Sequence, residues 1–392
     1  MQVTIEKIVY TGKSLAHING KVVLTDEGLP GEIVEVEPVQ EKKNYIEAKT
    51  TGIIKISDKR VTPRCSHYKS CSPYQYIDYA YQLEIKEAQL REILVHDLKT
   101  DFKDIIVRPS SGIWGYRNKI RLKVLWKSGV PHLAYHVPQT TNEFTEIDEC
   151  FLASPEMNHL FAATLKTLVE KKALFVDEIE IKESFSEKSF LTILHSASHK
   201  KPLIIGKDFI EEKVSGKLFQ FGAQSFFQVN VSMLEELVKD IKASVPLTGK
   251  ETIADLYCGV GTLGILLSEN AGKVIGVESE RENISFLKKN LLINNVGNFD
   301  VREGYCEKLI QDILKQKVDL ILVDPPRKGL DEAVCKNIIK HNVRFIAYVS
   351  CNPSTLTRDL KILLKKYRLS RIWLYDFFPH TTHIEVCVLL EG

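Results

Sequence analysis

The carboxyl-terminal part of this chain alternates short apolar runs with helical patterns. From residue 223 onward, strand candidates occur at 252–257, 273–278, 299–303, 318–324, 343–350, 371–378 and 383–390. Segments with helical spacing lie between them at 262–270, 280–293, 331–340 and 354–366. This alternation predicts an α/β fold with a doubly wound, Rossmann-like sheet. No helical segment separates the last two strands, so we expect them to form an antiparallel hairpin at a mixed sheet edge.

The rest of the sequence predicts two further domains. Residues 1–57 contain short β-type runs between glycines and prolines, which indicates either a small OB-like β-barrel or a β-rich extension. Residues 58–222 combine helical patterns at 81–99 and 156–172 with strand candidates at 119–126, 131–136, 177–183 and 190–197. We therefore expect three domains, namely a β-domain at 1–57, a central α+β domain at 58–222 and the doubly wound domain at 223–392.

Composition excludes several classes of protein. The chain has 53 basic and 51 acidic side chains, so its net charge of +2 gives no argument for nucleic acid. The amino terminus lacks the apolar core of a signal peptide, and no apolar run reaches the roughly 18 residues that a membrane span needs. We expect a cytoplasmic monomer without membrane contact, whose eight cysteines are reduced.

The first strand of the doubly wound region ends in a glycine-rich loop, DLYCGVG (255–261), and the next strand ends in Glu278. Gly259 and Gly261 let a ligand approach the main chain, and an acid after the second strand is placed to bind ribose hydroxyls. The letters GVGTLG also match a dinucleotide site. The residues before the first glycine, and an Asp-Pro-Pro loop further on, favour S-adenosylmethionine instead.

Three later strand ends carry reactive side chains. Asp324 opens the Asp-Pro-Pro loop, and Cys351 directly precedes Asn352, a natural N-cap for the next helix. A thiol before a helix N-terminus is expected to have a lowered pKa, which makes Cys351 a candidate nucleophile rather than an inert core residue. Glu385 lies in an otherwise apolar strand and is either a general base or a solvent-facing edge residue.

These residues together predict methylation of a pyrimidine carbon. Uracil C5 is a weak nucleophile, and addition of a thiolate at C6 makes it reactive enough to accept a methyl group. The C5 proton must then be removed by a base. Methylation of a base amino group is an alternative reading of the Asp-Pro-Pro loop, and it would leave Cys351 dispensable.

The sequence also suggests RNA contacts and a metal site. Basic residues recur at every second position of 117–123, which predicts one basic strand face suited to phosphates or simply a solvated face. The candidate RNA-binding residues are Arg117, Lys119, Arg121, Lys123, Arg327 and Lys328. Cys65, Cys71 and Cys150 are candidate metal ligands, although spacing alone favours unligated thiols equally.

The chain resembles the RNA 5-methyluridine (uracil-C5) methyltransferase family in the form that carries a TRAM domain. The matching segments are 12–16, 20–23, 29–32, 227–230, 255–262, 324–329, 350–353 and 383–385. The resemblance implies that Cys351 is the nucleophile and Glu385 the base. It also implies S-adenosylmethionine contacts from Gln228, Tyr257, Glu278 and Asp324, of which Asp324 also lies near the target uracil.

The resemblance further implies an RNA substrate. Ribosomal RNA is favoured by the TRAM pattern, with transfer RNA as the alternative, and a non-catalytic RNA-binding scaffold is the alternative of another class. Many family members carry a four-iron four-sulfur cluster, and Cys65, Cys71 and Cys150 match three of its ligand positions. The third position of the family's pattern falls on Tyr74, and Ser72-Pro73 replaces its two glycines, so both a three-thiol or labile cluster and a lost cluster remain open.

Overall fold

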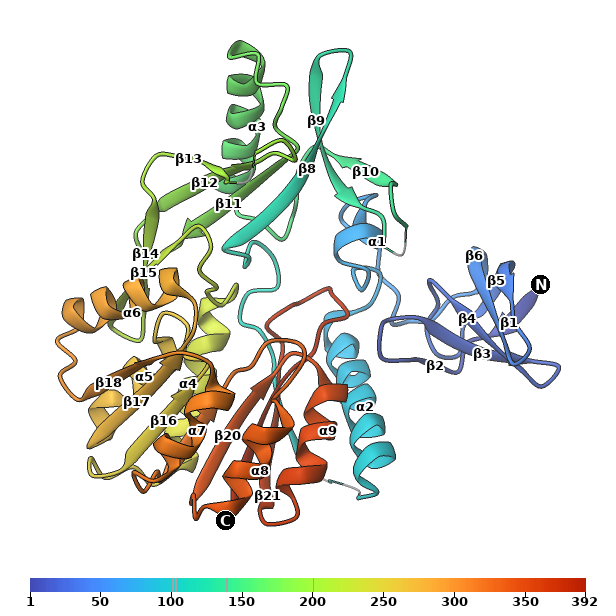
Figure 1. Cartoon of the computed structure of the whole chain (residues 1–392). Coiled ribbons are helices and arrows are strands. Elements are labelled where there is room, and N and C mark those ends of the chain that lie inside the picture. The colour runs from blue at the N-terminus through green and yellow to red at the C-terminus, as the bar shows by residue number, and fades with distance from the viewer. Residues whose placement is uncertain (101, 103, 139, 200) are drawn as a thin grey trace. The chain divides into compact units, whose positions relative to one another are not determined.

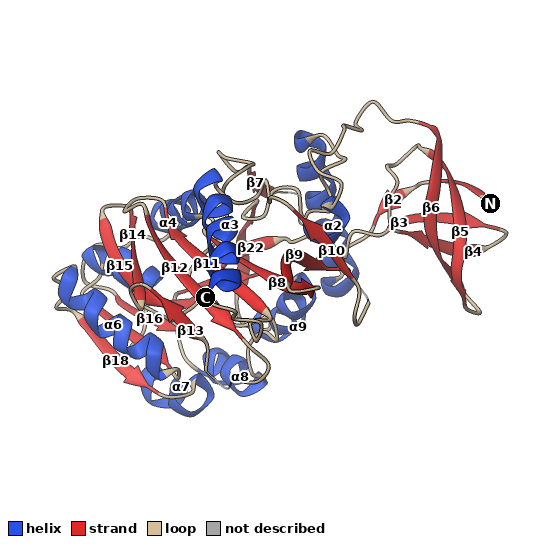
Figure 2. Ribbon diagram, turned by 90° about the horizontal axis from the view of Figure 1, so that it is seen from above, coloured by secondary structure: helices blue, strands red, loops and turns tan. Residues whose placement is uncertain are grey.

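A computed structural model describes the chain except for residues 101, 103, 139 and 200 (Figures 1 and 2). Contacts divide it into two compact units. Unit 1 comprises Met1–Phe102 and Phe378–Ile384, and unit 2 comprises Lys103–Phe377 and Glu385–Gly392. The division into three domains at residues 57 and 222 stays a prediction.

Unit 1 contains a six-stranded sheet of order β1-β5-β6-β4-β3-β2. Its strands are β1 (Gln2–Thr4), β2 (Lys7–Ile8), β3 (Ser14–Ile18), β4 (Lys21–Thr25), β5 (Ile33–Glu41) and β6 (Tyr45–Lys55). Alternating apolar side chains such as Val3, Val23 and Val34 fill its core, as a period of two requires. Within the described residues β1 does not pair with β2, so a closed OB-like barrel stays a prediction.

Two helices follow this sheet, α1 (Tyr68–Cys71) and α2 (Tyr79–Leu98). Asp78 caps α2 by accepting a hydrogen bond from the Tyr81 N–H, which explains why the helix begins there. The helix predicted over 81–99 is therefore confirmed. Ile85 of α2 packs with Tyr74 and Tyr76 in a second apolar cluster of unit 1.

Unit 2 begins with an antiparallel sheet of order β10-β9-β8-β11-β12-β13. These strands are β8 (Lys119–Lys127), β9 (Val130–His136), β10 (Phe144–Ile147), β11 (Glu178–Ser184), β12 (Ser189–His195) and β13 (Leu203–Ile205). Helix α3 (Pro155–Glu170) covers one face through Met157, Phe161 and Leu168 (Figure 2). A separate hairpin of β14 (Phe209–Val214) and β15 (Lys217–Gly222) comes next.

An eight-stranded sheet of order β18-β17-β16-β19-β20-β22-β21-β7 completes unit 2. Its strands are β7 (Ile105–Arg108), β16 (Thr252–Leu256), β17 (Lys273–Glu278), β18 (Phe299–Glu303), β19 (Leu320–Val323), β20 (Phe345–Ser350), β21 (Arg368–Tyr375) and β22 (Glu385–Glu391). The helices are α4 (Val231–Ser244), α5 (Thr262–Leu267), α6 (Arg281–Ile293), α7 (Cys306–Leu314), α8 (Glu332–Lys340) and α9 (Pro353–Leu363). A 3₁₀ turn, Ser268–Asn270, extends α5, and α7, α8 and α9 pack in series (Figure 1).

This sheet confirms the predicted doubly wound, Rossmann-like fold, because β18, β17, β16, β19 and β20 are parallel and joined by helices. The last two strands form the predicted antiparallel pair, but β22 lies inside the sheet between β20 and β21. The edge strand is β7, which was not predicted and which pairs in parallel with β21. Arg108 of β7 and Tyr375 of β21 both bond to Asp240 of α4, which fastens this edge. Among the described residues, no helix is both long and apolar enough to cross a bilayer.

Candidate active site

The glycine-rich loop between β16 and α5 is shaped by left-handed backbone conformations. Tyr257, Gly259 and Gly261 have φ angles of 62°, 57° and 87°. A Cβ atom at Gly261 would lie 2.3 Å from Leu287 Cδ1, so this position needs glycine. A Cβ atom at Gly259 would meet nothing within 4 Å. A ligand can therefore approach the main chain closely at Gly259.

Glu278 holds this loop from the end of β17. One of its oxygens accepts a hydrogen bond of 2.9 Å from the Gly259 N–H. The other accepts bonds of 2.6 and 2.8 Å from the two amides that follow Glu278. The carboxylate thus ties together the ends of the two strands that the sequence assigned to cofactor binding.

Asp255 is a candidate site residue that the sequence reasoning missed. Its carboxyl group accepts a hydrogen bond of 2.8 Å from the Gly264 N–H in α5. Burial raises the pKa of Asp255 to about 7; the Gly264 bond opposes this rise, and the charges of Asp324 and Glu278 add to it. The available signal was an acid inside an apolar strand, where a carboxyl group is costly without a partner.

Cys351 and Glu385 lie at facing ends of neighbouring strands. Ser350, the last residue of β20, pairs with Val386 of antiparallel β22. Cys351 follows Ser350 and Glu385 precedes Val386, so both residues adjoin the same end of this strand pair. Glu385 is only 3% exposed, which excludes the solvent-facing alternative, and Cys351 is half-buried.

The acidity of the Cys351 thiol differs from the sequence prediction. The thiol does precede α9, and Asn352 caps that helix as expected. However, burial raises the pKa of Cys351, and the charges of Glu385 and Asp324 raise it further, whereas Arg327 and a main-chain hydrogen bond oppose this rise. The prediction of a lowered pKa is therefore wrong, because one helix N-terminus contributes less than burial beside two carboxyl groups.

The two acids of this cluster are also perturbed. Burial raises the pKa of Glu385 well above its usual value; the charge of Asp324 adds to this rise and Arg327 opposes it. Burial raises the pKa of Asp324 to about 6, against the effect of a hydrogen bond from Gln228. Both carboxyl groups therefore hold a proton more readily than exposed carboxyl groups do.

Gln228 joins the loop before α4 to the Asp-Pro-Pro loop. Its side-chain Nε2 donates to Asp324 Oδ2 at 3.3 Å, while its main-chain carbonyl oxygen accepts a bond of 2.9 Å from Asn118 Nδ2. The preceding Phe227 stacks on Phe221 of β15, with ring centroids 4.2 Å apart. Asn118 thus positions a predicted site residue, and no motif had indicated it.

The loop after β19 presents cations beside this cluster. The carbonyl oxygen of Arg327 accepts bonds from Asn352 Nδ2 at 3.1 Å and Thr355 Oγ1 at 3.3 Å, which fasten the loop to α9. The carbonyl oxygen of Lys328 accepts a bond of 2.9 Å from Arg358. The side chains of Arg327 and Lys328 remain exposed. The main chain is therefore fixed and the two charges face solvent.

The basic strand β8 has the predicted alternation but not the predicted charge. Lys119, Arg121 and Lys123 share one face, yet acids of the neighbouring strand β11 lie against them. Lys119 Nζ lies 3.1 Å from Glu180, Arg121 pairs with Glu178, and Lys123 Nζ lies 3.8 Å from Glu178. The face is therefore largely neutralised, and the expectation of a fully basic face is wrong.

Arg117 precedes β8 instead of lying within it, and its Nε lies 3.5 Å from Tyr116 Oη. It therefore does not extend the face of the other three cations. RNA binding by the four residues stays a prediction.

The three candidate metal ligands do not form a recognisable site. Cys65 and Cys71 belong to unit 1 and Cys150 to unit 2. Cys65 Sγ lies 3.4 Å from Gln75 Nε2, Cys71 Sγ bonds to the neighbouring serine hydroxyl, and Tyr74 at the third ligand position is buried. Across the described parts of the chain, no cluster of three or more His, Cys, Asp or Glu side chains is suited to a metal ion. An iron–sulfur cluster on these thiols therefore stays a prediction.

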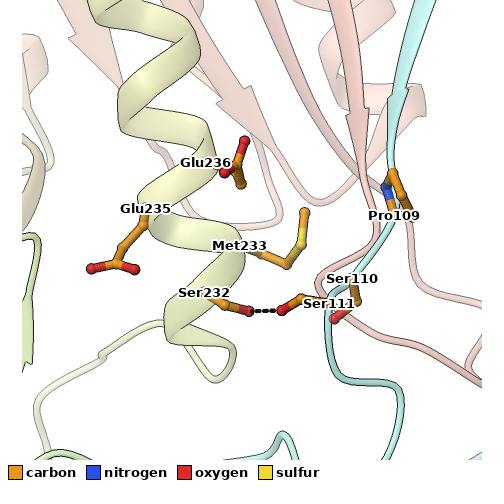
Figure 3. A pocket seen from close by; sticks show the side chains of 7 residues that line it. All are labelled: Pro109, Ser110, Ser111, Ser232, Met233, Glu235 and Glu236. Atoms are coloured by element: carbon orange, nitrogen blue, oxygen red, sulfur yellow. Dashed lines mark hydrogen bonds between the residues drawn. The ribbon is translucent and has the colours of Figure 1, made fainter.

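A cavity of about 380 Å³ lies between the start of α4 and the chain that follows β7 (Figure 3). It is lined by Pro109, Ser110, Ser111, Ser232, Met233, Glu235 and Glu236. Ser111 and Ser232 share a hydrogen bond of 3.3 Å within it. The lining includes none of the predicted site residues, so size alone does not mark the active site here. A second cavity of similar volume lies against β9, β10 and α3.

The chain is similar to known RNA methyltransferases. A family model described as tRNA (Uracil-5-)-methyltransferase matches residues 176–392. An uncharacterized RNA methyltransferase of Halalkalibacterium halodurans is 30% identical, over 100% of this chain and 96% of its own length. Another, from Listeria monocytogenes, is 28% identical over 99% and 96%. The crystal structure of a Pyrococcus abyssi tRNA (uracil-54, C5)-methyltransferase with S-adenosyl-L-homocysteine is similar over 100% of both chains, with a TM-score of 0.79 and 25% identity.

Proposed function

Because the chain belongs to the tRNA (uracil-5-)-methyltransferase family, we propose that it methylates uracil C5 in RNA through a transient covalent bond from Cys351. The observation that supports this proposal is the pairing of Ser350 with Val386, because Cys351 and buried Glu385 are the residues next to that pair. Asp324 and Arg327 act electrostatically on both groups, so the four residues form one site. Methylation of an amino group would need no such thiol.

S-adenosylmethionine is the methyl donor that we propose, and the glycine-rich loop fits it. The main chain at Gly259 faces open space, Glu278 fixes that loop, and the P. abyssi relative was solved with the demethylated product of this donor. When bound, the donor supplies an electrophilic methyl group. The residues proposed to hold it are Gln228, Tyr257, Gly259, Gly261, Glu278 and Asp324.

The side chains then have the following roles. Cys351, which is partly exposed, gives its proton to solvent water; its sulfur then bonds to C6 of the uracil, and the electron pair of the C5–C6 double bond moves toward C5 and O4. C5 thereby becomes nucleophilic enough to accept a methyl group. Glu385 takes the C5 proton, the double bond re-forms and the carbon–sulfur bond breaks. Burial makes Glu385 a stronger base than an exposed carboxylate, and it acts in its deprotonated form.

RNA that contains 5-fluorouridine tests the covalent step. With fluorine at C5 no proton can be removed, so the protein–RNA adduct should persist on a denaturing gel in the presence of S-adenosylmethionine. Cys351→Ala should give no adduct. Wild-type protein without an adduct, or an equal amount in Cys351→Ala, refutes the mechanism. Retained methyl transfer in Cys351→Ala would indicate amino-group methylation, and RNA binding without any methyl transfer would indicate a scaffold.

Ribosomal RNA is the substrate class that we propose, from the resemblance of residues 12–32 to a TRAM domain. Transfer RNA is a second candidate, favoured by the whole-length similarity to the P. abyssi tRNA methyltransferase. Methylation of purified ribosomal and transfer RNA from a deletion strain distinguishes them. Only RNA that carries the missing 5-methyluridine site should accept a labelled methyl group.

A further inference from the structure

Strands β21 and β22 of unit 2 are joined by a segment that belongs to unit 1. β21 ends at Tyr375, and residues Phe378–Ile384 are part of unit 1. The chain returns to unit 2 at Glu385, the first residue of β22 and the proposed base. Contacts that hold the segment 378–384 therefore restrain the chain directly before Glu385.

Gln82 of α2 makes the densest set of these contacts. Its side chain is fully buried. Its Nε2 lies within hydrogen-bond distance of the carbonyl oxygens of Tyr74 and Ile77, at 3.1 and 2.9 Å, and of His380 Nδ1, at 3.0 Å. Its Oε1 accepts a bond of 2.9 Å from the His380 N–H. The side-chain amide of Gln82 thus bonds to both the main chain and the ring of His380.

These hydrogen bonds hold His380 in an uncommon backbone conformation. Its φ angle is 64°, a left-handed conformation that is uncommon for a residue with a side chain. Burial lowers the pKa of the His380 ring to about 3, and the positive charges of Lys86 and Arg64 lower it further. The ring is therefore neutral at neutral pH, and its Nδ1 accepts from the Gln82 amide.

Further contacts hold the same segment. Lys86, one turn after Gln82 and fully buried, donates from Nζ to the Phe378 carbonyl oxygen at 3.1 Å. The Tyr74 N–H donates to the His380 carbonyl oxygen at 2.9 Å. A Cβ atom at Gly12 would lie 2.3 Å from Thr382 Cγ2, so glycine allows that close approach. The segment is thus held by specific polar contacts as well as by packing.

A glutamine that served only to stabilise helix α2 would not need to contact residues 378–384. Gln89, two turns after Gln82 on the same helix, is also buried. Its Nε2 donates to the carbonyl oxygens of Ile8 and Val9 and to Tyr74 Oη, each at 3.0 Å. These bonds of Gln89 hold other parts of unit 1, so Gln89 provides a matched comparison for Gln82.

We propose that Gln82 and Lys86 are positioning residues for Glu385. They fix the segment 378–384 within unit 1, and through the continuous chain they set where β22 begins. Removal of the C5 proton then depends on unit 1, although none of its residues needs to touch the uracil. This inference rests on the proposed covalent mechanism and adds a second requirement to it.

The experiment separates adduct formation from adduct release. Gln82→Ala leaves the His380 N–H without this acceptor and removes one donor from the carbonyl oxygens of Tyr74 and Ile77, which loosens the segment. With 5-fluorouridine RNA the variant should form its adduct as fast as wild type, because Cys351 is untouched. With normal RNA the adduct should accumulate, and its release should slow by about 10- to 100-fold, as expected when a catalytic group is displaced by about 1 Å.

Gln89→Ala is the control and should release its adduct at the wild-type rate. Equal slowing in Gln82→Ala and Gln89→Ala, or wild-type release in Gln82→Ala, overturns the proposal. Absence of any 5-fluorouridine adduct in wild type instead removes the proposed function itself. Circular dichroism checks folding, and if Gln82→Ala does not fold, Lys86→Met carries the same test. Lys86→Met removes the bond to the Phe378 carbonyl oxygen, and wild-type release from this variant also overturns the proposal.

Discussion

In unit 1 a single arginine after β6 lies between two buried acids. Arg60 Nη1 lies 2.6 Å from Glu27 Oε1, and Arg60 Nε and Nη2 each lie 2.8 Å from an oxygen of Glu32. The side chain of Glu32 is 0% exposed and that of Glu27 is 11% exposed. Arg60→Met keeps a long apolar stem but leaves both carboxylates buried without this cation.

The expected cost follows from these contacts. Removing one partner of a buried ion pair costs about 3–5 kcal/mol. Glu32 retains two main-chain donors, and Glu27 retains Lys69 at 2.8 Å and a tyrosine hydroxyl. We therefore expect Arg60→Met to reduce the free energy of unfolding of unit 1 by about 3 kcal/mol at pH 7, the lower end of that range.

The loss should depend on pH. Burial alone raises the pKa of Glu27 and Glu32, but hydrogen bonds from Arg60 and other donors outweigh it, so both pKa values lie below the usual 4.5. A carboxyl group whose pKa is lowered in the folded state contributes stability above its unfolded pKa and loses it as pH falls through the folded pKa. The difference between wild type and Arg60→Met should therefore shrink below about pH 4.5.

Hydrogen exchange followed by mass spectrometry measures this for peptides of unit 1 alone. Lys69→Met is the control: Lys69 also pairs with Glu27, but its side chain is 43% exposed, so the loss should stay below about 1 kcal/mol. A loss below about 1 kcal/mol for Arg60→Met at pH 7, or one that persists unchanged to pH 4, would refute the reasoning.

Three further predictions concern the active site and RNA. Asp324→Asn removes a charge that raises the pKa of Cys351, so the pH midpoint for alkylation of this thiol should fall, measured against a Cys351→Ala background; an unchanged or higher midpoint contradicts the assignment. Glu385→Gln should accumulate the adduct with normal RNA, and rapid turnover would exclude it as the base. Lys328→Ala should weaken RNA binding and reduce the slope of log affinity against log salt by about 1, whereas Arg121→Ala, whose charge is paired, should change it little; equal slopes in both variants contradict this distinction.

The doubly wound sheet could be predicted because its signal is local. Each buried parallel strand appears in the sequence as an apolar run. The loops that follow two of these runs contain residues of recognisable chemistry, Asp324 and Cys351. The N-cap at Asn352 is equally local and is confirmed. By contrast, β7 has only four residues, and nothing near it in sequence indicates that it pairs with β21.

The charges that surround the basic strand and the Cys351 thiol could not be predicted, because they come from residues distant in sequence. Lys119 and Arg121 alternate as expected, yet their partners Glu180 and Glu178 come from a strand that follows a separate helix. The pKa of Cys351 was misjudged for the same reason. The helix terminus is visible in the sequence, whereas the burial and the Glu385 charge that outweigh it arise only when β22 pairs with β20.

The position of β22 has a consequence for synthesis on the ribosome. β20 and β21 leave the exit tunnel first, yet they cannot adopt their final spacing until β22 emerges and inserts between them. The proposed base arrives with that same strand. A nascent chain can thus complete the thiol-bearing half of its site early, but it gains the means to finish a reaction only with the strand that closes the gap.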